Sequence, residues 1–86
     1  MLSFDDAQKA IRMQQAVPVG RYRHFKGAEY VVIGVARHSE TEEELVVYHA
    51  LASPTLLWVR PVHLFTDTVT RNGVQKPRFS PIDRDR

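Results

Sequence analysis

The 86-residue chain contains no cysteine, which excludes several kinds of site. Without thiols there is no disulfide framework, no cysteine nucleophile and no cysteine-ligated zinc. Long apolar runs are also missing, since none approaches the ~20 residues that cross a bilayer. Residues 1–6 have neither the basic segment nor the apolar segment of a signal peptide. We therefore expect a cytoplasmic protein that does not bind membranes.

Several sequence signatures of known chemistry are absent too. The chain has no G-x-x-x-x-G-K loop, no G-x-G-x-x-G turn and no His-Glu-x-x-His helix. A zinc site needs three or four converging ligands. Only His38 and Glu40 are spaced to share one side of an extended segment. Ser39 points away from its neighbour His38, so we expect it to bond to the local backbone. We predict no metal, no cofactor and no catalytic residue, and a binding protein rather than an enzyme.

The size and composition of the chain fit one small soluble domain. Its hydrophobic fraction is 43%, its charged fraction is 26% and its net charge is +2. The basic residues gather in two groups, Arg21, Arg23 and Lys26, and then Arg71, Lys76 and Arg78, while residues 42–44 are all glutamate. Basic clusters suit phosphate or acidic partners, although the same charges can simply solvate strand edges.

The N-terminal part of the chain has a helical pattern. Ser3 is a good N-cap, Asp5 and Asp6 suit the positive end of a helix dipole, and Pro18 forces the chain out of the helical region. We therefore expect a helix over residues 2–16, within an N-terminal helical segment of residues 1–18.

After this segment the pattern becomes that of short strands. Alternating or β-branched runs predict strands at residues 19–24, 30–36, 45–51 and 56–60, the second covered on both faces. Gly34 indicates a bulge, residues 53–55 a turn and residues 62–65 a helical turn. Asn72-Gly73 predicts a hairpin that pairs residues 66–71 with residues 74–79. We predict a mainly β fold, a small SH3-like antiparallel barrel over residues 19–79, with a flexible tail at residues 80–86.

Many polar and aromatic side chains lie at or near the ends of these strands. Such side chains on a rigid scaffold are the usual place for a binding site. The candidate ligand-binding residues are Tyr22, His24, Lys26, Arg37, His38, Glu40, Trp58 and Arg60. Basic residues interleaved with aromatic residues on a small barrel are how single-stranded nucleic acid is often held. Our leading hypothesis is therefore a module that binds an anionic ligand, a nucleotide or nucleic acid.

Within that hypothesis each side chain has a role. Lys26, Arg37 and Arg60 would supply positive charge, because arginine offers a planar fork for phosphate. The histidines His24 and His38 would add hydrogen bonds. Tyr22 and Trp58 would provide stacking surfaces.

Other readings of the same residues stay open. Tyr22, Tyr48 and Trp58 could line a groove for an extended peptide, with the acidic loop of residues 40–44 selecting a basic partner. A pair of histidines, His24 and His38, could run phosphodiester hydrolysis if both reach the reacting group. The aromatic residues could also be core, and the polar ones a network that fixes the fold. The oligomeric state is left open.

Five motifs carry a resemblance to a known family. They are GRYRHFKG at residues 20–27, ARHSET at 36–41, LVVY at 45–48, WVRP at 58–61, and Phe65. In this order and spacing, over residues 19–79, they resemble a widespread bacterial family of small domains of unknown function. The resemblance implies a compact β domain and emphasises the same eight candidate positions. It implies no activity, cofactor or catalytic residue.

Overall fold

The computed structural model describes residues 3, 5, 8 and 16–82 of the chain, and these are mainly β, as predicted. Their elements are β1 (Gly20–His24), β2 (Glu29–Arg37), β3 (Glu44–Ala50), β4 (Ser53–Pro61), the helical turn α2 (Val62–Phe65), β5 (Thr68–Arg71), β6 (Val74–Pro77) and β7 (Phe79–Pro81). The helix expected over residues 2–16 lies, apart from four positions, outside the described residues. The helical turn predicted at residues 62–65 is confirmed.

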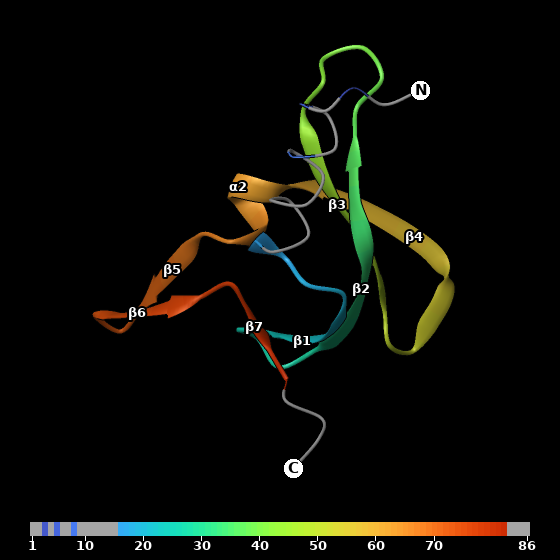
Figure 1. Ribbon diagram of the computed structural model, residues 1–86. Coiled ribbons are helices and arrows are strands. Elements are labelled where there is room, and N and C mark those ends of the chain that lie inside the picture. The colour runs from blue at the N-terminus through green and yellow to red at the C-terminus, as the bar shows by residue number, and fades with distance from the viewer. Residues whose placement is uncertain (1–2, 4, 6–7, 9–15, 83–86) are drawn as a thin grey trace.

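Five strands form one antiparallel sheet in the order β4-β3-β2-β1-β7 (Figure 1). The two β-branched apolar runs of the sequence become β2 and β3, which lie inside this sheet. The turn expected at residues 53–55 is wrong, because β4 already begins at Ser53 and the chain turns at Leu51 and Ala52. The remaining pair, β5 and β6, forms a separate two-stranded hairpin.

The bulge predicted at Gly34 is confirmed. The register between β2 and β3 shifts between Val32 and Gly34, so Ile33 is the extra residue. A bulge reverses the alternation of side chains, and Val35 therefore returns to the face that holds Val32. The expectation that β2 is covered on both faces is wrong, since Ile33 is 49% exposed.

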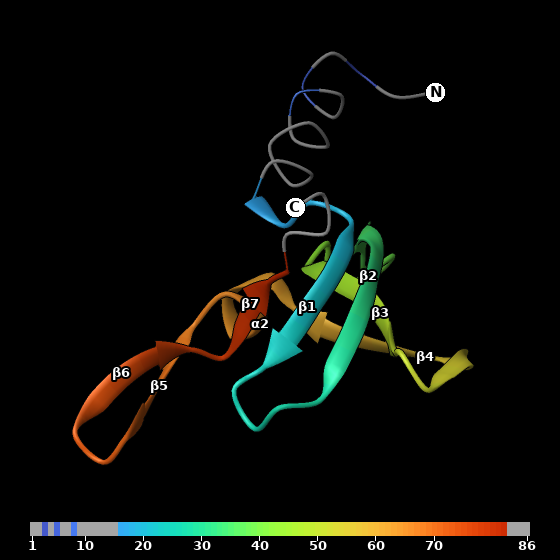
Figure 2. The same ribbon diagram turned by 90° about the horizontal axis from the view of Figure 1, so that it is seen from below.

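The predicted closed barrel does not form among the described strands, because the sheet is open. After α2 the chain leaves the sheet in the β5–β6 hairpin, which projects away from it (Figures 1 and 2). The hairpin itself was predicted correctly: Thr68 pairs with Pro77 and Arg71 with Val74. Its turn residues Asn72 and Gly73 both have positive φ, 53° and 77°, as a type I′ turn requires.

The chain then returns to the sheet as β7, which pairs with β1 from Tyr22 opposite Pro81 to His24 opposite Phe79. The tail was expected to be flexible from Ser80. Instead Ser80 and Pro81 belong to β7, and the N–H of Ile82 still donates to β1. Three residues ending in proline carry too little β pattern to be recognised from the sequence.

The core lies between α2 and the inner face of the sheet. Its buried residues are Val17, Tyr22, Val32, Val46, Tyr48, Phe65 and Phe79. Phe65 of α2 stacks on Phe79 of β7 with ring centres 4.1 Å apart. The Tyr22 hydroxyl donates to the Pro18 carbonyl at 2.7 Å, and burial raises the pKa of Tyr22.

Candidate functional site

The inner face of the sheet continues beyond the core as a surface of aromatic side chains. Trp58 lies opposite Tyr48, and Tyr48 lies opposite Val32 of the core. Residues opposite each other in a sheet share a face, and so do residues two apart along a strand. Tyr30 and Arg60 therefore belong to the same face as Trp58.

These side chains line an open cavity of about 390 Å³, which we call the aromatic groove. It is lined by Tyr30, Tyr48, Ala50, Ser53, Leu56, Trp58 and Arg60. Tyr48 forms its floor, since it is 7% exposed, and the Tyr30 ring meets it edge-on at 5.6 Å. Trp58 is 50% exposed. A half-exposed indole beside a cation offers a stacking surface.

Arg60 gives the groove its charge. Its Nε lies 3.5 Å from the Tyr48 hydroxyl, at the limit of a hydrogen bond, and its guanidinium carbon lies 5.8 Å from the centre of the Phe79 ring. Within the described part of the chain it forms no ion pair. The guanidinium thus keeps donors for a ligand, and none of the residues lining the groove is acidic.

His24 lies on the same face of the sheet, at the end of β1. Its ring contacts Phe79 edge-on, with ring centres 5.0 Å apart. Nδ1 accepts the backbone N–H of Lys26 at 3.1 Å, so the neutral ring carries its proton on Nε2. Burial, and then the nearby charges of Arg78, Lys26 and Arg60, lower the pKa of His24 below its ordinary value. The lowered pKa favours the neutral form of the His24 ring at pH 7.

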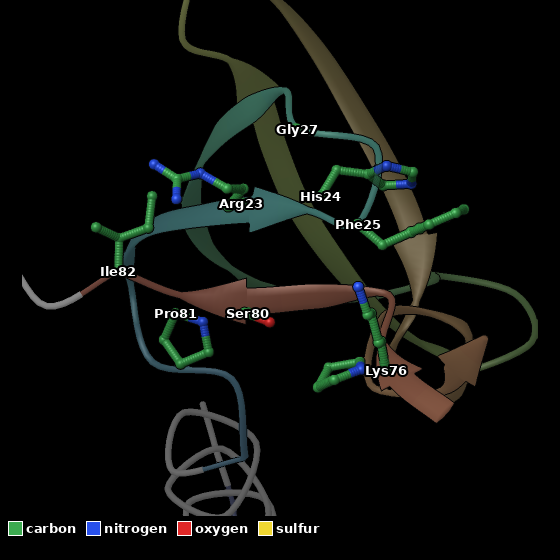
Figure 3. A pocket seen from close by; sticks show the side chains of 9 residues that line it. Arg23, His24, Phe25, Gly27, Lys76, Ser80, Pro81 and Ile82 are labelled. Atoms are coloured by element: carbon green, nitrogen blue, oxygen red, sulfur yellow. The ribbon is translucent and has the colours of Figure 1, made fainter. Parts of the chain in front are cut away.

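A second and larger cavity, of about 500 Å³, opens beside β1 and β7 (Figure 3). Arg23 and Ser80 face each other across these strands and alternate with His24 and Phe79, so they lie on the outer face of the sheet. Lys76 of β6 points toward the same space (Figure 3).

Arg23 in this cavity shares the carboxylate of Glu29 with Arg21. It donates to Glu29 at 3.0 Å. Hydrogen bonds from Arg21 and Arg23 hold the pKa of Glu29 below its usual range. Arg23 already has a carboxylate partner within the protein. This cavity is therefore a weaker candidate for an anion site than the aromatic groove.

The structure does not bring all eight predicted site residues together. Arg37 ends β2 and His38 and Glu40 follow it, whereas His24 lies beside the beginning of β2. At about 3.3 Å per residue, the two histidines are about 25–30 Å apart. They cannot act on one phosphodiester, so the arrangement does not support the hydrolase reading.

His38 has a role in its own loop. Its Nδ1 accepts the backbone N–H groups of Glu40 at 3.1 Å and Thr41 at 3.3 Å, and its carbonyl accepts from Glu42. Glu42 has a φ of 62°, which shows how tightly the loop turns. These bonds explain the residue pattern of the loop without a ligand.

Two further predicted residues take other positions. Tyr22 is only 6% exposed in the core, so it cannot offer a stacking surface. Lys26 is exposed in the turn after β1, with its ammonium 5.8 Å from the centre of the Phe25 ring.

Sequence reasoning missed Tyr30 and Leu56 as groove residues. Strand alternation contained the signal, because Leu56 is two residues from Trp58.

Two broader observations concern the described residues alone. Nowhere in residues 16–82, nor at the three described positions before them, do three histidine or carboxylate side chains gather as a metal site. Among the same residues, no helix is long and apolar enough to cross a membrane.

Fold and groove together define a small, mainly β domain built on an open antiparallel sheet. Residues 20–81 match the model of a protein family of unknown function, DUF1653, and the chain belongs to this family. A crystal structure of a DUF1653 protein from Bordetella bronchiseptica is similar, with a TM-score of 0.72 and 34% identity over 80% of this chain and 91% of that one. No curated protein matches the chain.

Proposed function

We propose that the aromatic groove binds an anionic ligand that carries a planar ring, of the class of nucleotides and single-stranded nucleic acids. The observation that carries the proposal is the pairing of a half-exposed Trp58 with Arg60, which has no carboxylate partner among the described residues. A nucleotide has both complementary parts, a ring that stacks and a phosphate that accepts hydrogen bonds.

The magnitudes favour such a ligand over a simple anion. Stacking on an aromatic side chain is worth about 1–3 kcal/mol per base. A charge-assisted hydrogen bond from arginine to phosphate is about twice as strong as a neutral one. Trp58 and Arg60 are two residues apart on β4 and share a face, so one nucleotide can engage both.

The architecture supports the same kind of module. We propose that the open sheet is of SH3-like type, because the helical turn α2 and a departing hairpin precede its last strand, β7. Small β modules of this kind commonly place their ligands on aromatic surfaces.

An extended peptide is the second candidate ligand. The half-exposure of Trp58 next to Tyr48 and Leu56 favours it, because SH3-like domains hold extended segments in aromatic grooves. Binding of a largely apolar peptide would depend on Trp58 and only weakly on Arg60. The contribution of Arg60 to affinity therefore distinguishes a peptide ligand from a nucleotide ligand.

The proposal can be tested with the intrinsic fluorescence of Trp58, the single tryptophan of the chain. Titration with a short oligodeoxythymidylate should quench it, and the affinity should fall as salt is raised from about 50 to 200 mM, because phosphate binding releases counterions. Arg60→Gln should weaken binding about tenfold or more, because a hydrogen bond to a charged group is worth about 1.5–3 kcal/mol.

The matched control is Arg37→Gln, which removes the same charge at the far end of β2 and should leave the affinity unchanged. Quenching by a peptide library that ignores both salt and Arg60 would favour the peptide groove. An oligonucleotide affinity equal in Arg60→Gln and the parent protein would contradict the proposal.

A further inference from the structure

Strand β4 forms an open edge of the sheet. It has nine residues and is last in the strand order, so within the described part of the chain its outer side has no strand partner. Natural edge strands are usually protected by charge, by proline or by being short. Strand β4 has prolines near its two ends, Pro54 and Pro61, but residues 55–59 between them are Thr-Leu-Leu-Trp-Val, with neither charge nor proline. The four apolar side chains of this segment are 50–59% exposed.

The backbone directions identify which groups of β4 are unused. The N–H of Leu51 donates to β2. Alternation along β3 therefore turns the N–H of Tyr48 toward β4, where it meets Trp58. The residues on either side, Leu57 and Val59, then point their N–H and C=O groups away from β3. The N–H and C=O groups of these two residues can form hydrogen bonds with another strand.

The opposite edge of the sheet is closed to pairing. Strand β7 has only three residues, ends in Pro81 and follows Pro77 closely. Short length and proline are both devices that prevent edge pairing. The five-stranded sheet thus has one edge, β7, that is protected along its length, and one edge, β4, that is protected only near its ends. Because β4 is the one open edge of the described five-stranded sheet, self-association of β4 with β4 closes at two copies instead of growing into a filament.

We propose that two copies of this chain pair through β4, antiparallel across a two-fold axis. The hydrogen-bonded ladder joins Leu57 to Val59 of the partner subunit, and Val59 to Leu57 of the partner subunit. This register places the two Trp58 residues opposite each other at the axis, on the face of the aromatic groove. Aromatic pairs in such positions stabilise a sheet by about 0.2–1 kcal/mol.

The charge pattern of β4 is compatible with this register. Arg60 is the only charged residue of β4. In the paired strands it lies opposite Leu56 of the partner subunit, and the two Arg60 side chains are four residues apart. Like charges directly opposite each other destabilise a sheet, and the register avoids this arrangement.

The exposed area predicts a weak dimer. Four half-exposed side chains per copy supply less than the ~800 Å² per partner of a standard interface. The dimer should therefore dissociate on dilution. Pairing also has a consequence for the groove, because the two inner faces become continuous and the two Trp58 side chains meet. The pairing itself does not depend on what the groove binds.

Sedimentation velocity over a wide range of protein concentration tests the pairing. The parent protein should shift from monomer to dimer as its concentration rises. Leu57→Lys puts like charges close together across the axis and should raise the dimer dissociation constant about tenfold or more. Leu51→Lys is the matched control, since Leu51 is 46% exposed but lies in the turn before β4. It should dimerise like the parent protein.

Mixing Leu57→Lys with Leu57→Glu should restore the dimer, because the charges then attract. A parent protein that stays monomeric at millimolar concentration overturns the proposal. An equal effect of the lysine at positions 57 and 51 overturns it as well, since the contact then lies elsewhere.

Hydrogen exchange on the parent protein gives a test that needs no variant. The backbone amides of Leu57 and Val59 should exchange several-fold more slowly at high protein concentration than at low concentration. The amide of Ser39, in the exposed loop after β2, should not change. Concentration-independent exchange at Leu57 and Val59 overturns the proposal even if a lysine variant fails to fold.

Discussion

At the scale of single residues, a cation that is paired with a carboxylate of the protein has a structural role. A cation without such a pair is a candidate for binding a ligand. Arg23 is paired with Glu29, and Arg78 donates to Asp67 at 2.7 Å. Water screens ion pairs at the protein surface, so these two pairs orient the chain more than they stabilise it. Arg60 differs, because it forms no ion pair with a described carboxylate and Asp67 feels its charge only at longer range.

His24 leads to a prediction about pH. Because burial and three cations lower its pKa, the unfolded chain takes up a proton near pH 6.5 and the folded protein only at lower pH. The free energy of unfolding should therefore fall as pH drops from about 7 to 5.5. Urea denaturation of the parent protein and of His24→Asn, compared at both pH values, measures this effect.

Asparagine is the suitable replacement because its side-chain oxygen can accept the Lys26 N–H that Nδ1 now accepts. The His24→Asn protein should lose less stability than the parent over the same pH range. Glu29 and Asp67 have lowered pKa values, so their contribution is lost only at lower pH. An identical pH dependence in the two proteins would show that His24 is not responsible.

At the scale of elements, the sequence predicted what is local. The β-branched runs of β2 and β3 and the Asn72-Gly73 hairpin were found because each depends on neighbouring residues. Strand β7 was missed, since three residues ending in Pro81 become a strand only through β1. Closure of the sheet was also predicted incorrectly, because it depends on pairing between distant segments.

The glycines of β2 and of the turn before it give a prediction at this scale. No heavy atom lies within 4 Å of a Cβ added at Gly34, whose φ is not in the left-handed region. Gly34→Ala should therefore raise the free energy of unfolding by about 0.4–1 kcal/mol, by restricting the unfolded chain. Gly27 has a φ of 108°, and Gly27→Ala should lower it by about 1–2 kcal/mol.

Chemical denaturation of the two variants measures the difference. If Gly34→Ala destabilises the protein as much as Gly27→Ala does, the bulge requires glycine for a reason other than backbone conformation or space.

At the scale of the whole molecule, the sheet divides the predicted site. The sequence identified Trp58 and Arg60, which lie together in the groove, because costly side chains at strand ends are often functional. It also grouped His38 with them. Strand length explains this error, since nine residues of β2 separate the two ends of the sheet. The hypotheses for Trp58 assumed that it is exposed, but the strand pattern left a core position equally open, because exposure depends on the position of β4 at the edge.

The central claim is that the ligand occupies the aromatic groove. The most direct measurement is an amide and indole NMR titration of the parent protein with a short oligodeoxythymidylate. The account predicts that the Trp58 indole signal and the backbone signals of Tyr48 and Arg60 move, while those of His38 and Glu40 stay in place. Shifts confined to the His38 loop or to Arg23 and Lys76 of the outer cavity, or no shift at all, would contradict it.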